Sequence, residues 1–305
     1  MNVSTPLVLI LFNRPRLTKA VFTTIAKARP KQLLIVADAP RFPEEEQKCL
    51  EARSIVQAVD WECDVRTNIA KTNMGCRQRI VSGLNWAFSL VEEAIILEDD
   101  CVPHESFFGY CETLLNYYRH DQRVMEISGC NYQKGRTDET YSYYFSRYYH
   151  TLGWATWKRA WAHYDESIST WPEVKQSEWW KALFDDGNEH AYWTAIYDQI
   201  HQGGLPTSWD YQWQFARWCH NGLAAVSTVN LVSNIGFGSD ATNTKSEHDF
   251  RARLPVSDIG RIQHPLSIER HRDADHHRFH TVELLNPGII WHIESRISRI
   301  ARVFT

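Results

Sequence analysis

The chain has 305 residues, of which 43% are hydrophobic and 23% charged, and its formal net charge is -4. This composition is ordinary for a globular protein and excludes disorder on a large scale. It also argues against a general nucleic-acid binder, because such proteins carry a strong basic excess. At this length the chain can form one large α/β domain or two small ones, and no low-complexity linker divides it.

Four short apolar runs alternate with helical patterns in the first half of the sequence. They are Leu7 to Phe12, Leu33 to Ala37, the weaker Asp64 to Ile69, and Ala94 to Leu97. Apolar strands that alternate with helices predict a mainly parallel sheet with helices on both faces. The N-terminal stretch lacks a basic region and a small-residue cleavage site, so we interpret it as the first strand rather than a signal peptide.

The second half of the sequence is less regular. Tyr141 to Ser146 indicates a strand, helical patterns run from about Glu178 to Asn221, and the chain beyond Asn234 has the composition of loops. Seven cysteines are present without a C-x-x-C pair, which indicates neither a zinc knuckle nor a disulfide framework. Reduced thiols, and the lack of any stretch of ~18 apolar residues that could span a bilayer, predict a cytoplasmic protein.

Polar or turn-forming residues follow each of the four apolar runs. These are Asn13 and Arg14, Asp38, the stretch from Asn73 to Arg77, and the acidic trio of Glu98, Asp99 and Asp100. Ligands of parallel sheets bind beyond the carboxyl ends of the strands. The pattern therefore predicts one site built from four separate places. Strand ends are polar in many proteins, so this pattern alone leaves the function open.

The acidic trio places three adjacent carboxylates directly behind an apolar strand. Such groups repel one another and need a counter-charge. A divalent cation supplies it, and hard oxygen ligands suit Mg²⁺ or Mn²⁺. These ions bind one or two protein carboxylates, while substrate phosphates and water complete the coordination shell. This coordination suits a nucleotide diphosphate, because the ion stabilises the negative charge that develops on the leaving diphosphate. A solvated acidic turn is the alternative interpretation.

The segment AIILEDDCVPHESFF resembles the metal-binding segment of GT-A glycosyltransferases. It is especially similar to the EDD segment of N-acetylglucosaminyltransferase I and to bacterial family 2-like transferases. The stretches FNRP, DAPR, NMGCR and GWATW also agree with the bacterial group, in the same order. The resemblance covers roughly Pro6 to Asn243, most of the chain.

This resemblance implies an α/β, Rossmann-like GT-A fold of nucleotide-diphospho-sugar transferases over residues 1–245. Residues 1–130 would form the donor-binding half, residues 131–245 the acceptor-facing half, and residues 246–305 a C-terminal extension. The implied enzyme transfers a hexosyl or N-acetylhexosaminyl group to a hydroxyl of a glycan or lipid-linked glycan. A uridine diphosphate sugar is the commonest donor that the resemblance implies.

The expected donor-binding residues surround the ends of the first four strands and the GWATW segment. They are Phe12, Asn13, Arg14, Asp38, Asn73, Arg77, Glu98, Asp99 and Trp154. By the resemblance, Asp100 would ligate the Mn²⁺ or Mg²⁺ ion and Asp99 would contact the donor ribose or support the metal shell. Glu98 would orient the nucleoside and Asp38 would accept from the base edge. Arginine guanidinium groups match phosphate geometry, although each taken alone also suits a surface charge.

Asp210, in SWDYQWQFARW, is the candidate catalytic base. If a helix begins at Ser208, then Asp210, Gln214 and Arg217 fall on one face of it. An inverting transferase needs a carboxylate to take the proton of the acceptor hydroxyl. The segment also resembles the place where family 2 transferases carry an acidic base followed by Q-x-x-R-W. An aspartate stabilised by the dipole of a helix N-terminus is the alternative.

The tryptophans of the GWATWKRAW segment receive two different assignments. Trp154 stands beside Gly153 in an expected turn, so we assign it to the donor site. We assign Trp157 and Trp161 to the ordinary aromatic core.

Three features beyond Asn234 stay open. Asn243 stands where related sequences often place a histidine, so Asp240 or His248 could complete the metal shell instead. The tract from His271 to His280 matches no zinc-finger spacing and is not favoured as a metal site. The segment from Gly288 onward has an apolar helical stripe interleaved with arginines. It predicts packing against its own domain or a second subunit, or attachment to the cytoplasmic face of a membrane.

Other functions explain less of the sequence. A nucleotidyltransferase shares the expected fold and metal requirement, but needs a Gly-rich phosphate loop after the first strand, and LFNRPRLTKA contains no glycine. A metal-dependent hydrolase would need a richer histidine ligand set. A sugar-binding protein without transferase activity explains the tryptophans but neither the acidic trio nor Asp210.

Overall fold

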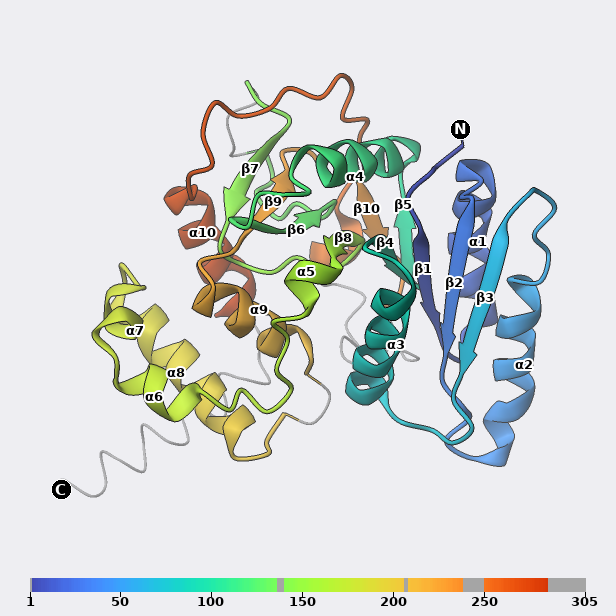
Figure 1. Cartoon of the computed structure of the whole chain (residues 1–305), viewed down its shortest axis with the longest axis horizontal. Helices are drawn as coiled ribbons and strands as arrows, with labels where there is room; N and C mark the ends of the chain where they lie inside the picture. Colours follow the sequence, from blue (N-terminus) through green and yellow to red (C-terminus); the bar gives the residue numbers. More distant parts are fainter. Residues whose placement is uncertain (1, 136–139, 206–207, 238–249, 285–305) are drawn as a thin grey trace.

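The computed structural model describes residues 2–135, 140–205, 208–237 and 250–284. The segments that contain Asp240, Asn243 and His248, the 245/246 boundary, and the stretch from Gly288 onward lie outside the described residues. Figure 1 shows a large sheet with helices on both faces, and a helical region that extends away from it around α6, α7 and α8. None of the described helices is long and apolar enough to span a membrane.

An eight-stranded sheet in the order β3-β2-β1-β4-β8-β6-β9-β7 forms the centre of the described fold. Its strands are β1 (Leu7–Leu11), β2 (Gln32–Ala37), β3 (Asp64–Ile69), β4 (Glu93–Glu98), β6 (Val124–Ser128), β7 (Tyr143–Ser146), β8 (Trp154–Trp157) and β9 (Leu223–Ser227). Within this sheet β7 and β8 run against the other six strands. The mainly parallel α/β architecture is therefore confirmed. A second, two-stranded sheet pairs β5 (Cys101–Pro103) with β10 (Val232–Asn234).

The first four strands coincide closely with the four apolar runs of the sequence. All five residues of β1 are buried, because helices cover both faces of the sheet at this strand. In contrast, β3 is the edge strand and most of its side chains are exposed. The charged side chains of Asp64 and Arg66 protect this edge from pairing with another chain. The weaker apolar pattern of β3 is thus a consequence of its position.

Two layers of helices enclose the sheet. One face packs against α1 (Pro15–Ala28), α2 (Glu46–Ile55) and α4 (Glu105–Tyr117), and the other against α3 (Cys76–Leu90), α5 (Lys158–Trp161) and α9 (Asp210–Cys219). Figure 1 shows α1 and α2 side by side, away from α3. Pro15 begins α1, as its fixed φ favours. Short 3-10 turns occupy Pro43–Glu45 and Phe250–Arg253.

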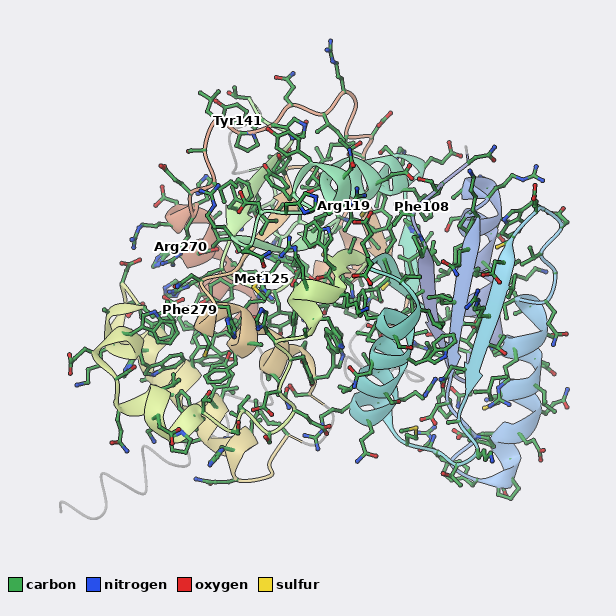
Figure 2. The ribbon with its side chains drawn as sticks, viewed as in Figure 1. Phe108, Arg119, Met125, Tyr141, Arg270 and Phe279 are labelled. Atoms are coloured by element: carbon green, nitrogen blue, oxygen red, sulfur yellow. The ribbon has the colours of Figure 1, made fainter. Side chains whose placement is uncertain are left out.

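A second core, rich in aromatic rings, lies in the helical region. It joins α6 (Trp171–Gln176), α7 (Glu178–Ala182) and α8 (Gly187–His201) to α9. Near it lie α10 (Arg272–Arg278) and the π-helical turn Phe279–Glu283. In Figure 2 the labelled Phe279 belongs to this core, and its ring centroid lies 5.4 Å from that of Tyr192. Most of the tryptophans are thus structural.

A buried ion pair attaches α9 to the central sheet. The carboxylate of Glu126 in β6 lies 3.3 Å from Nε of Arg217 and accepts a hydrogen bond of 2.8 Å from Nε1 of Trp213. Both charged side chains are fully buried. Removing one partner of such a pair leaves an uncompensated charge out of water, so the pair holds α9 in a defined position.

We expect Gly83→Ala to destabilise the fold, because a Cβ there would lie 2.3 Å from Cγ1 of Val36. Separating α3 from β2 to relieve this clash should lower the free energy of unfolding by about 1–3 kcal/mol. Gly187→Ala is the matched control, since a Cβ there meets no atom within 4 Å. Urea denaturation of both variants tests the packing. Equal stabilities would contradict the close approach of α3 to β2.

Candidate functional site

The strand order makes the carboxyl ends of β1 and β4 a topological switch point, and the term crevice denotes the region beyond these two ends, around Arg14 and Asp100. From β1 the chain passes through α1 to β2 on one side, and it later returns to β4 on the other side of β1. Open α/β sheets bind ligands at such a switch point. The register opposes Ile10 to Glu98, so the residues that follow the two strands emerge next to each other.

Arg14 joins the ends of these two strands. Its guanidinium pairs with the carboxylate of Asp99, and its Nη1 lies 3.0 Å from Oδ2 of Asp100. The backbone N–H of Phe12 also donates to Asp99, at 3.2 Å. The carboxylate of Asp99 is thus fully engaged by the protein. Asp100 keeps more of its side chain accessible, 13% against 3% for Asp99.

The crevice holds three neighbouring carboxyl groups, Glu98, Asp99 and Asp100, and Arg14 pairs with two of them. Burial raises the pKa of Glu98 above its usual range, and the charge of Asp100 adds to this shift. Burial likewise raises the pKa of Asp99, although Arg14 opposes the shift. A group of carboxylates whose ionised forms are disfavoured in this way is suited to a cation. The electrostatics therefore fit a divalent ion held by oxygen ligands.

The second half of the chain approaches Asp100 from the other side. Because β10 pairs with β5, the backbone N–H of Ile235 reaches the carbonyl of Asp100 at 2.9 Å. A Cβ at Gly236 would lie only 2.1 Å from Oδ2 of Asp100, so any side chain there would displace this carboxylate. Within the described residues the acidic trio does not form a compact set of three ligand atoms. The arrangement fits an ion bound through Asp100, with phosphate oxygens and water as the other ligands.

Asp210 begins α9 and faces the same crevice. Its Oδ1 accepts from the backbone N–H of Tyr211 and from the hydroxyl of Ser208, each at 3.1 Å. Burial raises its pKa, while hydrogen bonds, including one from Tyr149, oppose the shift. Its charge in turn contributes to the raised pKa of Glu98. The predicted base and the predicted metal-binding segment therefore share one electrostatic environment, although α9 begins at Asp210 rather than at Ser208.

Cys76 lies close to all of these groups, although no sequence pattern assigns it a role. Burial raises the pKa of its thiol to about 12, and the charges of Glu98, Asp210 and Asp100 add to the shift while Arg14 opposes it. As the first residue of α3 it follows Gly75, whose φ of 76° favours glycine. Its position within NMGCR was the only signal in the sequence.

Asp38 and Asn73 connect the end of β2 to the turn that precedes α3. Oδ1 of Asp38 accepts from the backbone N–H of Met74 at 2.9 Å, and Oδ2 accepts from Gly75 at 3.0 Å and from Nδ2 of Asn73 at 3.1 Å. The same amide of Asn73 donates to the carbonyl of Ala39 at 2.7 Å. The buried carboxylate thus holds the turn, and its predicted contact with a base edge stays a prediction.

The two arginines at the start of α3 have different environments. Arg77 is partly exposed and its Nε lies 3.2 Å from Oε1 of Glu166. Arg79 is buried, and its Nη2 donates to the backbone and side-chain oxygens of Asn68 at 2.8 and 2.7 Å. The side chain of Arg77 is therefore partly accessible to solvent, whereas Arg79 joins the end of β3 to α3.

Trp154 requires a correction. It is the first residue of β8, is 1% exposed, and its ring centroid lies 5.7 Å from that of Trp209 and 5.9 Å from that of Trp213. It is therefore a core residue and does not line a donor pocket. The strand alternation directs it toward α3 and α9, whereas Trp157 faces α4. The assignment of Trp157 and Trp161 to the core is confirmed.

A cation–aromatic group at the rim was not foreseen. The guanidinium of Arg41 lies 5.4 Å from the ring centroids of both Phe12 and Phe42. Glu45 fixes it, pairing with Arg41 and accepting from Nδ2 of Asn13 at 2.8 Å. Phe42 is 52% exposed. Such exposed planar groups can stack on a nucleobase or sugar ring.

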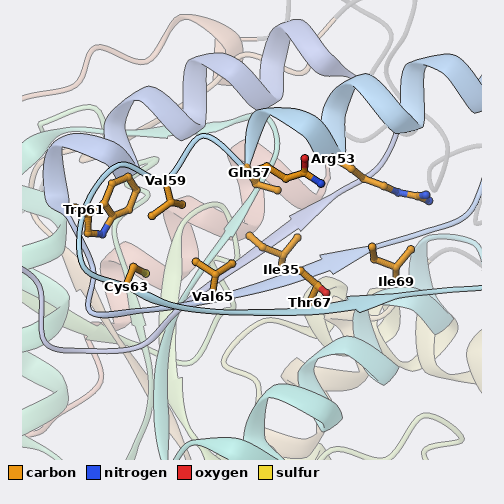
Figure 3. A pocket seen from close by; sticks show the side chains of 10 residues that line it. Ile35, Arg53, Gln57, Val59, Trp61, Cys63, Val65, Thr67 and Ile69 are labelled. Atoms are coloured by element: carbon orange, nitrogen blue, oxygen red, sulfur yellow. The ribbon is translucent and has the colours of Figure 1, made fainter.

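A cavity of about 410 Å³ lies away from this crevice, between α2 and the outer strands β2 and β3 (Figure 3). Its walls include Val56, Val59, Trp61 and Val65. It contains none of the predicted site residues.

No protein-family model matches the chain, and no curated protein matches its sequence. Among solved structures, a UDP-glucose pyrophosphorylase complexed with UDP-glucose is similar at 13% identity and a TM-score of 0.27, over 46% of this chain and 62% of that one. The inositol-1-phosphate CTP transferase from T. maritima is similar at 10% identity and a TM-score of 0.39, over 84% of this chain and 97% of that one. The 4-diphosphocytidyl-2C-methyl-D-erythritolsynthase from Anaerococcus prevotii DSM 20548 is similar at 9% identity and a TM-score of 0.31, over 64% of this chain and 84% of that one. Likenesses this distant carry no argument about activity.

We expect Asp38→Asn to destabilise the protein even without any ligand. Asparagine has one acceptor oxygen and would turn an N–H₂ group toward backbone N–H donors, which should lower the free energy of unfolding by about 1–3 kcal/mol. The exposed Asp60 provides the matched control, Asp60→Asn. Denaturant unfolding of both variants is the measurement. Wild-type stability of Asp38→Asn would show that the turn does not depend on this carboxylate.

Proposed function

We propose that this chain is a metal-dependent glycosyltransferase that moves a sugar from a nucleotide-diphosphate donor to a hydroxyl of a glycan or lipid-linked glycan. The observation that supports this most directly is the convergence of three remote segments at one crevice. Arg14, the trio at Glu98–Asp100, and Asp210 contribute to one electrostatic environment. Such a crevice offers a cation site, an anion-binding arginine and a separate carboxylate.

The donor would bind at the ends of β1, β2 and β4. Asp100 would hold Mn²⁺ or Mg²⁺, and the bound ion supplies positive charge to the departing diphosphate. Arg14 and the accessible Arg77 provide guanidinium groups for phosphate oxygens. The Phe12, Arg41 and Phe42 group offers a stacking surface for the base, and a uridine diphosphate sugar is the donor we expect.

Asp210 would act on the acceptor. The acceptor oxygen forms a bond to the anomeric carbon while the bond from that carbon to the diphosphate oxygen breaks, and the electron pair leaves with the diphosphate. The proton of the acceptor hydroxyl passes to a carboxylate oxygen of Asp210. Ser208 and the N–H of Tyr211 orient this carboxylate. A base on the face opposite the leaving group inverts the anomeric configuration.

Thermal denaturation with a panel of nucleotide diphosphates and nucleotide sugars tests donor binding. We expect one nucleotide class to raise the melting temperature in Mn²⁺ but not in chelator, because a ligand that binds only the folded state stabilises it by mass action. Asp100→Ala should lose this shift. Stabilisation that is independent of both metal and Asp100, or no stabilisation by any nucleotide, would contradict the proposal.

Asp210→Asn should separate catalysis from donor binding. We expect kcat for sugar transfer to fall on the order of 10²–10⁴-fold, while the nucleotide-induced rise in melting temperature is kept. Glu105→Gln is the matched control, since Glu105 occupies the same first position in α4 and is exposed. Product analysis provides the second readout. Release of pyrophosphate from a nucleoside triphosphate, without sugar transfer, would indicate a nucleotidyltransferase instead.

A further inference from the structure

The histidine-rich segment around α10 is held against the start of α8. Arg270 and Arg272 both pair with Asp185, at 3.5 and 2.6 Å, and Figure 2 labels Arg270 in this region. Arg270 also pairs with the buried Asp275 of α10. These contacts fix the position of the next residue, Asp186, relative to α10. None of them involves the crevice described above.

Two histidines and this aspartate bring their ligand atoms together. His276 and His280 stand four residues apart, and their ring centroids are 4.2 Å apart. One side-chain ligand atom from each of Asp186, His276 and His280 lies within 4.8 Å of the other two. Histidines at i and i+4 on one face of a helical segment form a recurrent metal-binding pair.

The distance between Asp186 and His280 is longer than a typical hydrogen bond and matches that between two atoms bound to one metal ion. Nε2 of His280 lies 3.5 Å from Oδ2 of Asp186, and in the described part of the chain this buried nitrogen has no hydrogen-bond partner. Two atoms bound to one tetrahedral ion at about 2.0–2.2 Å are roughly 3.4 Å apart. The pair is thus spaced for an ion between its members.

The two oxygens of Asp186 have separate tasks. Oδ1 accepts from the backbone N–H of Asn188 at 2.8 Å and caps α8. Oδ2 is directed toward His280. Ligating carboxylates are commonly oriented by such an outer hydrogen bond. The helix cap therefore orients the carboxylate as a ligand.

We propose that Asp186, His276 and His280 bind one divalent transition-metal ion of the zinc class. Imidazole nitrogens with a carboxylate favour Zn²⁺, Co²⁺ or Ni²⁺ over Mg²⁺ or Ca²⁺. A cavity of about 510 Å³ adjoins the two histidines, so water could complete the coordination of an ion bound there. The ion joins α8 to α10. The proposal differs from the expectation from sequence, where the tract from His271 to His280 matches no zinc-finger spacing and is not favoured as a metal site.

The test uses the full-length chain without a histidine tag, stripped of metal by chelator. After incubation with Zn²⁺ and gel filtration, elemental analysis should find about one zinc ion per chain, and Co²⁺ should give the visible absorption of a four-coordinate site. His276→Gln and His280→Gln should each weaken Zn²⁺ binding by at least about tenfold. Asp186→Asn should do the same, since asparagine keeps the helix cap but removes the charged ligand.

Two further variants serve as controls. His201→Gln changes an exposed histidine at the end of α8 and should bind zinc as the wild type does. Asp100→Ala should also retain zinc, which separates this site from the crevice. Circular dichroism in chelator establishes that each variant is folded, and the exposure of His276 makes its replacement a mild change. Failure of the wild type to retain zinc, or unchanged binding in both His276→Gln and His280→Gln, would overturn the proposal.

Discussion

The pairing of Arg14 with Asp99 and Asp100 is the interaction on which the candidate site depends. Ionised carboxylates removed from water are unstable without a compensating charge, and Asp99 is buried. The register of the sheet brings the compensating charge of Arg14 close. Ile10 in β1 lies opposite Glu98 in β4, so the residues that follow β1 emerge beside those that follow β4. The charge pair can form only where β1 and β4 are parallel neighbours. Their adjacency in the sheet thus determines the chemistry of the crevice.

The other side of the crevice is fixed by buried contacts from the second half of the chain. Glu126 in β6 holds Arg217 and Trp213, and so orients α9, whose first residue is Asp210. The pairing of β10 with β5 brings Gly236 against Asp100. A buried ion pair is costly to break, so α9 cannot shift without exposing an unpaired charge. Asp210 therefore faces the acidic segment as part of a rigid framework.

Local sequence patterns predicted the first half of the fold well and the second half only in part. The strand expected at Tyr141 to Ser146 and the helices expected between about Glu178 and Asn221 are present as β7 and as α7 to α9. Strands β1 and β4 are buried on both faces, so each appears in the sequence as a continuous apolar run that can be recognised without an alignment. The insertion of β8 between β4 and β6 depends on long-range antiparallel pairing that leaves no local mark. Gly153 indicates a turn, which favours an assignment of Trp154 to the donor site. Its burial depends on tertiary neighbours, chiefly Trp209 and Trp213.

Local sequence patterns also do not reveal which of two side chains close in sequence is buried and which is exposed. Arg77 and Arg79 both lie in the first turn of α3, yet two residues along a helix rotate a side chain by about 200°. That rotation places Arg79 against Asn68 in the interior and leaves Arg77 at the rim beside Glu166. The predicted role of Arg77 in donor binding thus suits its position at the rim, whereas Arg79 has a structural contact. A motif supplies chemically suitable residues, and helix phase with sheet register decides which of them can meet a ligand.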